Sequence, residues 1–132
     1  MKLLLDDEPG SDIAQDLWER ADLVMSSQLI YPEARAAAAA AHRAGRTSRR
    51  WLTAAVGTID SLYDVLRVIA LDDALARAAG DLAERHALRG YDAVHLASAL
   101  AIDAPGELVI ATWDQELAAA AVAEGRMVVP AQ

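Results

Sequence analysis

Three acidic residues stand at positions from which their side chains could act together: Glu33, Asp92 and Asp114. Each lies near the expected start of a helix, and two of them closely follow expected strands. Three carboxylates that converge on one point bind a metal ion, because carboxylate oxygens are ligands that hard cations prefer. The first question for this chain is therefore whether its elements bring these acids together.

Each acid also has an ordinary structural explanation. Asp92 and Asp114 occupy positions typical of helix N-caps, where a side-chain oxygen accepts a hydrogen bond from a backbone N–H group. Glu33 lies in an expected first helical turn, where the helix dipole favours a negative charge. On position alone, capping is the favoured interpretation of both aspartates.

Short strands alternate with helices along the chain. Apolar runs and β-branched residues predict strands at 23–25, 65–71, 108–111 and 127–129. The second of these could instead extend the helix before it. Helical spacing, caps and Gly or Pro boundaries predict helices from 11 or 12 to 19, 33–44, from 47 or 48 to 63, 72–86, from 92 to a break at 105–106, and 115–124.

This alternation predicts an α/β fold with a mostly parallel sheet and helices on both faces. Glu33 and Asp114 would lie just past the carboxyl ends of the strands at 23–25 and 108–111. Sheets of this kind bind ligands outside the carboxyl ends of their strands. We therefore expect both acids to face the same rim of the sheet.

Length and composition favour one domain over residues 1–132. The chain is 55% hydrophobic, contains no phenylalanine and is rich in alanine, which predicts closely packed helices. It has no cysteine, which excludes disulfides and thiolate metal sites and fits a reducing compartment. The sequence also shows no apolar run of membrane-spanning length. We expect a soluble, cytoplasmic protein with no membrane partner.

The net charge and the distribution of charge along the chain point to different partners. A net charge of −8 argues against a nucleic-acid partner, because phosphates are bound by basic residues. However, the segment from Ala34 to Ile59 contains five arginines and no acid. Such a segment could hold a phosphate chain, although charge alone favours the simpler interpretation of a solvated helix junction.

Three sequence words around the acids resemble the motifs of PIN-domain proteins, in particular the VapC-like toxins of bacterial toxin–antitoxin pairs. The words are SSQLIYPE at 26–33, GYDAVHLASA at 90–99 and VIATWDQEL at 109–117. They occur in the family's order, and the resemblance covers nearly the whole chain. It implies a three-layer PIN-like α/β fold.

The resemblance also implies an activity and its site. Glu33, Asp92 and Asp114 would be the catalytic and metal-binding residues of an endoribonuclease that depends on Mg²⁺ or Mn²⁺ and cuts structured RNA. Thr112, and more loosely Ser27, could orient a ligand or water. The expected partners are the RNA substrate, a small antitoxin protein and a second copy of the chain in a homodimer.

His95 and Tyr91, which flank Asp92 in the second word, receive lesser roles. Imidazole is a poor ligand for Mg²⁺, so His95 is expected to pack against a helix or to support the site indirectly. Tyr91 is expected in the core or at the rim of the site. The arginines at 35–50 are candidate contacts to RNA phosphates by charge, not by motif.

The beginning of the chain departs from the family pattern. Family members start with a central strand that ends in Asp-Thr-Ser, and this Asp is the first metal ligand. Here KLLLDDEPGS at 2–11 resembles the helix end and turn that follow that strand. We therefore expect the strand and one carboxylate to be missing and the activity to be impaired.

Two explanations for this departure remain open. Translation could begin upstream of Met1, or residues 1–5 could fill the vacant strand with Asp6 as the replacement ligand. The alternative function is a catalytically silent PIN-like domain that still binds an antitoxin or a dimer partner. A third possibility is an acidic helical adaptor in which all three carboxylates are caps.

Overall fold

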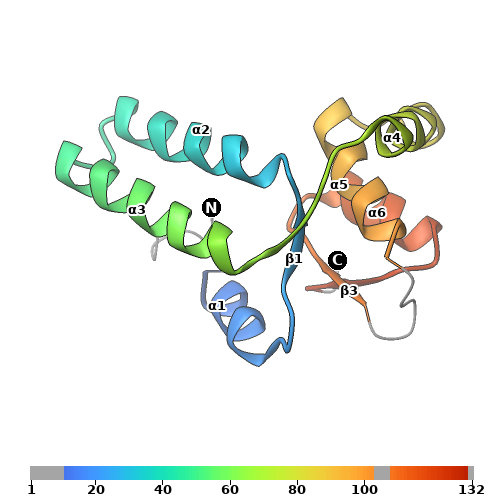
Figure 1. The fold of residues 1–132 in the computed structure, drawn as a ribbon, viewed down its shortest axis with the longest axis horizontal. Helices are drawn as coiled ribbons and strands as arrows, with labels where there is room; N and C mark the ends of the chain where they lie inside the picture. Colours follow the sequence, from blue (N-terminus) through green and yellow to red (C-terminus); the bar gives the residue numbers. More distant parts are fainter. Residues whose placement is uncertain (1–10, 103–107, 131–132) are drawn as a thin grey trace. The chain divides into compact units, whose positions relative to one another are not determined.

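The computed structural model describes residues 11–102 and 108–130. Its helices are α1 (Ser11–Arg20), α2 (Ile30–Arg43), α3 (Arg49–Val65), α4 (Asp73–His86), α5 (Gly90–Leu100) and α6 (Gln115–Ala123). Its strands are β1 (Met25–Ser27), β2 (Arg67–Ile69), β3 (Val109–Ala111) and β4 (Met127–Val129). The predicted features at residues 1–5, at Asp6 and at Pro105–Gly106 lie outside the described residues. The alternation of strands and helices confirms the α/β class (Figure 1).

The chain forms two compact units, residues 1–68 and 69–132. In the first unit, α2 and α3 pack against each other as a helical hairpin (Figure 1). Ala38 of α2 forms a buried core with Ala55 and Ile59 of α3, and Trp51 packs against this core. Alanine side chains let the two helix backbones approach closely, which is the packing that the composition predicts.

Local signals set the turn between α2 and α3. Ala44 is the C-cap of α2, and Gly45 follows it with a φ of 76°, a conformation that glycine adopts without strain. Ser48 caps α3, because its side chain accepts a hydrogen bond from the Trp51 N–H at 3.0 Å. The helix predicted to end at residue 44, before Gly45, ends within one residue of that position. Of the two predicted starts of the next helix, 47 or 48, Ser48 is the cap.

The start of α2 differs from the prediction. The helix begins at Ile30, before the predicted Glu33, and Pro32 lies in its first turn, where the missing N–H has no helical partner to lose. The Leu29 N–H donates to Ser27 Oγ at 3.2 Å, so a serine side chain closes the turn between β1 and α2. A short closed turn leaves no room for the longer connection that the sequence suggested.

β1 and β2 form a two-stranded sheet, in which β1 is displaced from its predicted position and β2 is shorter than predicted. β1 lies two residues beyond the predicted strand at 23–25, and its last residue, Ser27, is only 2% exposed. The strand therefore ends on a small, buried polar residue and not on the apolar run at 23–25. β2 is shorter than the predicted 65–71 because α3 continues to Val65, and the Leu66 N–H still bonds to carbonyls of the last turn.

The second unit packs three helices around one core (Figure 1). This core contains Leu and Ala residues from α4, α5, α6 and the α4–α5 connection: Leu75, Ala79, Leu82, Leu88, Ala93, Leu96, Ala97, Leu117, Ala120 and Ala121. β3 and β4 pair in parallel, with Ile110 opposite Val128, and α6 contacts β4. The sequence placed α4, α6, β3 and β4 to within one residue of their observed bounds.

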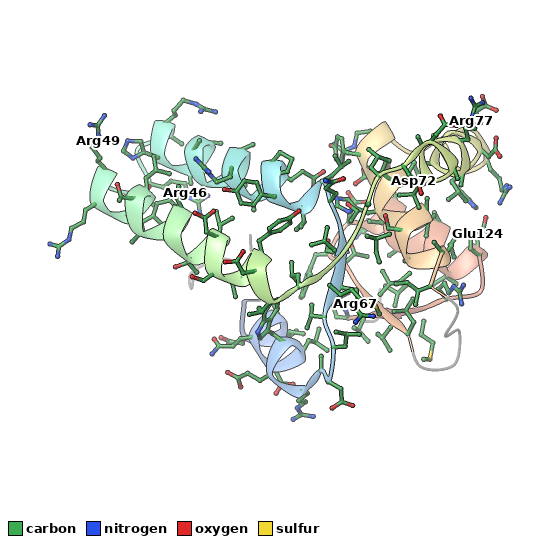
Figure 2. The ribbon with its side chains drawn as sticks, viewed as in Figure 1. Arg46, Arg49, Arg67, Asp72, Arg77 and Glu124 are labelled. Atoms are coloured by element: carbon green, nitrogen blue, oxygen red, sulfur yellow. The ribbon has the colours of Figure 1, made fainter. Side chains whose placement is uncertain are left out.

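An ion-pair cluster fastens the end of α4 to the end of α6. Arg85 Nη1 donates to Glu124 Oε1 at 2.6 Å, and His86 Nε2 lies 2.7 Å from the same oxygen. The contact with His86, and then the one with Arg85, lowers the pKa of the Glu124 carboxyl below its ordinary 4.5. Figure 2 shows Glu124 at this end of the unit. The cluster therefore favours the folded state when Glu124 is ionised.

Replacing Glu124 with glutamine should destabilise the protein in a pH-dependent way. A lowered carboxyl pKa contributes stability that is present above the ordinary value of 4.5 and is lost as the pH falls through the lowered value. At pH 7 we expect the free energy of unfolding to fall by about 1 kcal/mol. Urea unfolding at pH 7 and pH 3 measures this, and an equal loss at both pH values would contradict it. Glu116→Gln, an exposed glutamate on α6, is the control.

The described helices include none that combines the length and the apolar composition needed to cross a membrane.

Candidate active site

Asp92 is a buried carboxylate near the beginning of α5. It is 7% exposed and is the one charged residue among the buried side chains of the described part of the chain. The prediction that it opens and caps the helix was wrong, because α5 begins at Gly90 with Arg89 at the N-cap and has no side-chain cap bond. Asp92 lies in the first turn, where the helix dipole favours its charge. Capping therefore does not explain this buried acid.

Asp114 is the N-cap of α6, as its position predicted. Its Oδ1 accepts a hydrogen bond from the Leu117 N–H at 2.9 Å. Its own N–H donates to Thr112 Oγ1 at 3.1 Å, and the Thr112 N–H donates to the Val129 carbonyl, which ties the turn to the parallel strands. The second carboxylate oxygen, Oδ2, takes no part in the cap and faces another group.

That group is Arg89, which bridges the two aspartates. Arg89 Nε donates to Asp92 Oδ2 at 3.0 Å, and Arg89 Nη2 lies 3.4 Å from Asp114 Oδ2. The hydrogen bond to Asp92 raises the pKa of Arg89 above its ordinary value. Two carboxylates from different helices thus converge on a single cation.

The connection between α4 and α5 holds Arg89 in place. α4 ends at His86, its C-cap Ala87 has a left-handed conformation with φ of 53°, and Leu88 is then buried in the core. The chain is extended at Arg89, so that its side chain can reach the two carboxylates. The guanidinium also lies 4.7 Å from the centre of the Tyr91 ring, and Tyr91 is 42% exposed. Tyr91 therefore lies at the rim of the pair, one of the two positions predicted for it.

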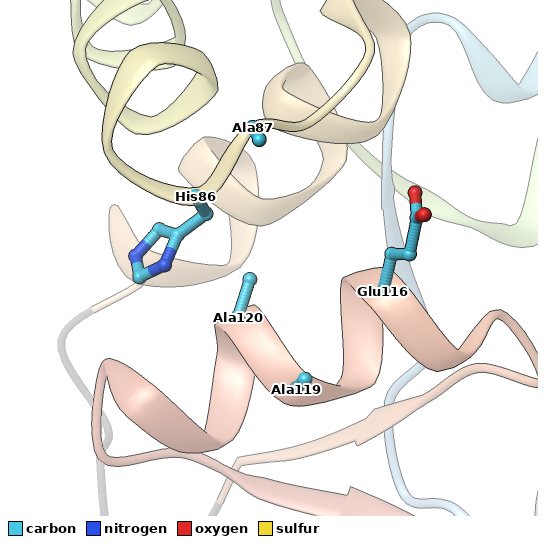
Figure 3. Close-up of a pocket in the computed structure, with 5 residues that line it drawn as sticks. All are labelled: His86, Ala87, Glu116, Ala119 and Ala120. Carbon is cyan, nitrogen blue, oxygen red and sulfur yellow. The ribbon is translucent and has the colours of Figure 1, made fainter.

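A separate pocket of about 320 Å³ opens between the end of α4 and α6 (Figure 3). His86, Ala87, Glu116, Ala119 and Ala120 line it. It offers one carboxylate and one imidazole, and that imidazole already contacts Glu124. A hard divalent cation needs more oxygen ligands than this lining supplies, so the Asp92–Asp114 pair is the better candidate site.

The sequence is similar to one known protein family and to two ribonucleases. A profile of the PIN domain matches residues 1–123. The chain belongs to the PIN-domain family. Ribonuclease VapC45 of Mycobacterium tuberculosis (strain CDC 1551 / Oshkosh) is 46% identical over 129 residues, which cover 98% of this chain and 89% of that protein. Ribonuclease VapC49 of Mycobacterium tuberculosis (strain ATCC 25618 / H37Rv) has the same identity and coverage. The resemblance drawn from the three sequence words is thus confirmed.

In this PIN domain, two of the three predicted site residues lie together, and the third belongs to the other unit. Asp92 and Asp114 lie in the second unit and share Arg89. Glu33 lies in the first turn of α2 in the first unit, with its Oε1 buried and its N–H bonded to the Leu29 carbonyl. Within residues 11–102 and 108–130, no three His, Asp or Glu side chains form a group that could hold a metal ion. The role of Glu33 stays a prediction.

Arg89 is the residue that the sequence interpretation missed. It stands three positions before Asp92, a spacing at which helical side chains of opposite charge meet. This spacing is visible in the sequence. The contact between Arg89 and Asp114, 25 residues away, had no signal in the local sequence.

The carboxylate pair of this PIN domain fits a divalent cation by its chemistry. Its donors are carboxylate oxygens, which suit Mg²⁺ and Mn²⁺, and an Arg89 guanidinium already lies where the two acids converge. Proteins often bind Mg²⁺ through one or two carboxylates, and the ion keeps several water ligands. The oxygen donors of this pair therefore suit the divalent cation that the sequence resemblance implies.

Proposed function

We propose that this protein is an endoribonuclease dependent on Mg²⁺ or Mn²⁺, the toxin of a VapBC-type toxin–antitoxin pair. The observation that carries the proposal is the convergence of Asp92 and Asp114 on one cationic group. The 46% identity to two proteins named as VapC ribonucleases supports it. An RNA substrate, a small antitoxin, a homodimer and a cytoplasmic location are parts of the same proposal.

The roles of the residues follow from their positions. Asp92 and Asp114 would hold the cation, with Glu33 as a further predicted ligand. When bound, the cation would lower the pKa of an attacking water and neutralise charge on the phosphate. The Asp114 N–H donates to Thr112 Oγ1, and the Leu117 N–H donates to Asp114 Oδ1. These contacts hold the Asp114 carboxylate in one orientation, which a metal ligand requires.

Cleavage of RNA under controlled metal conditions tests this function. The full chain is incubated with folded RNA in the presence of Mg²⁺, Mn²⁺ or EDTA, and the products are sized on a sequencing gel. We expect internal cuts with either cation and none with EDTA. Absence of cutting under all three conditions, together with binding of a cognate antitoxin, would instead establish the catalytically silent domain.

The arginines at the α2–α3 turn are candidates for holding the RNA backbone. Arg43, Arg46, Arg49 and Arg50 are all exposed, and none forms an ion pair with another described residue. Figure 2 shows Arg46 and Arg49 at the turn of the hairpin. Unneutralised arginines on an exposed turn attract phosphates more strongly than ion-paired ones do.

Removing three of these charges should reduce the salt dependence of RNA binding. Each phosphate contact contributes about 0.7 to the slope of log affinity against log salt for a single strand. The variant Arg46→Gln/Arg49→Gln/Arg50→Gln should therefore lower the slope by about 2. Fluorescence anisotropy with a labelled single-stranded oligoribonucleotide in EDTA measures it.

A matched control removes the same net charge elsewhere. Arg20, Arg77 and Arg85 each form an ion pair with a carboxylate, and all three are more than half exposed. Their replacement by glutamine should leave the slope nearly unchanged. Equal slopes for the hairpin variant and the parent protein would remove these arginines from the RNA site and leave the nuclease proposal intact.

A further inference from the structure

We propose that Arg89 is a built-in counter-cation, which occupies the carboxylate pair in the metal-free protein and is displaced when a divalent cation binds. This inference rests on the proposed function for its metal ion. The same side chain would then have two opposite effects on the site. Arg89 stabilises the empty site and weakens the affinity of that site for metal.

The two carboxylates need a cation at the point where they converge. Asp92 is 7% exposed and Asp114 is partly exposed, so their mutual repulsion is screened less than it would be in water. The second unit is also acidic overall, with ten Asp and Glu residues against four arginines in residues 69–132. A buried carboxylate without a partner is costly, and Arg89 is the partner that the structure provides.

Arg89 uses the oxygens that a metal would need. Its Nε takes Asp92 Oδ2 and its Nη2 faces Asp114 Oδ2. The other Asp114 oxygen is occupied by the N-cap bond to the Leu117 N–H. The Asp114 oxygen that lies outside the cap is thus the one that faces Arg89, and a cation that binds this oxygen competes with the guanidinium.

Arg89 can leave at little cost in packing. Its side chain is 59% exposed, and its backbone position is fixed independently by the buried Leu88. It can keep its contact with the exposed Tyr91 ring, 4.7 Å away, when it releases the aspartates. Side chains of this exposure change rotamer within nanoseconds, which is fast enough to exchange with a metal ion.

The test measures metal affinity and metal-free stability in the same variants of the full chain. The variant Arg89→Gln removes the charge, and Arg85→Gln is its matched control, because Arg85 is 58% exposed and pairs with Glu124 on the neighbouring helix. Mn²⁺ is titrated by isothermal calorimetry, and thermal unfolding is followed in EDTA. We expect Arg89→Gln to bind Mn²⁺ about tenfold more tightly and to melt at a lower temperature in EDTA.

The control variant Arg85→Gln should lose stability in EDTA without any gain in Mn²⁺ affinity. Unchanged or weaker Mn²⁺ binding by Arg89→Gln would overturn the inference while the metal assignment stands. Failure of the parent protein and of Arg89→Gln alike to bind Mn²⁺ would overturn both. If Arg89→Gln does not fold, Arg89→Lys decides, because one ammonium cannot bridge both carboxylates as the guanidinium fork does. Its Mn²⁺ affinity should exceed that of the parent protein, and an equal affinity would refute the competition.

Discussion

Replacing Asp92 with asparagine is expected to reduce RNA cleavage by at least about 100-fold at saturating Mg²⁺. The substitution keeps the shape of the side chain but removes the charge that a cation requires, at a position that is 7% exposed. It also leaves Arg89 with Asp114 as its one remaining partner in the pair. Single-turnover cleavage of a labelled RNA, with the enzyme in excess, measures the loss.

A control on a neighbouring helix separates this effect from a general loss of charge. Asp81 is an exposed residue of α4 in the same unit, and Asp81→Asn removes one negative charge from the surface. It should leave the cleavage rate within a factor of two or so, in line with small surface effects. Cleavage by Asp92→Asn at nearly the parent rate would refute the catalytic role of this carboxylate.

The largest expected loss of stability comes from Leu96→Ala. Leu96 is 1% exposed and belongs to the core that α4, α5 and α6 share. Truncation leaves a cavity, because interiors are close-packed and the alanines in this core are too short to move in and fill it. We expect the free energy of unfolding to fall by about 2–5 kcal/mol, measured by urea unfolding.

The matched comparison is Val122→Ala on α6, where the valine is 61% exposed. This change removes apolar atoms that remain in water in the folded state, so its effect should stay within about 0.5 kcal/mol. A similarly small effect of Leu96→Ala would show that the core repacks around smaller side chains. The alanine-rich composition argues against such repacking.

Elements with a side-chain cap were predictable from the sequence. Asp72 accepts a hydrogen bond from the Leu75 N–H, and Asp114 accepts one from the Leu117 N–H, so α4 and α6 start where their caps are. α2 and α5 have no side-chain cap bond, and both begin earlier than predicted. Their starting points depend on how the preceding chain packs, which no local signal in the sequence records.

Two of the three residues of the observed cluster could be predicted, but from motifs and not from caps. Asp92 and Asp114 were selected from their sequence words, and the structure brings both to one guanidinium. The guanidinium itself was not predicted, because a pairing across 25 residues depends on the packing of α5 against α6. Asp114 can cap α6 and contact Arg89 at the same time, because Oδ1 accepts the cap bond and Oδ2 faces the guanidinium.

The order in which the chain is synthesised bears on when this carboxylate pair can exist. The second unit is one continuous stretch of sequence, and Asp114 stands at the start of α6, the last helix. Its Thr112 support is tied in turn to Val129 in β4, close to the C-terminus. A nascent chain therefore completes α2, α3 and α5 well before it can fix Asp114 beside Arg89. The paired carboxylates therefore form only after the chain has been synthesised through β4.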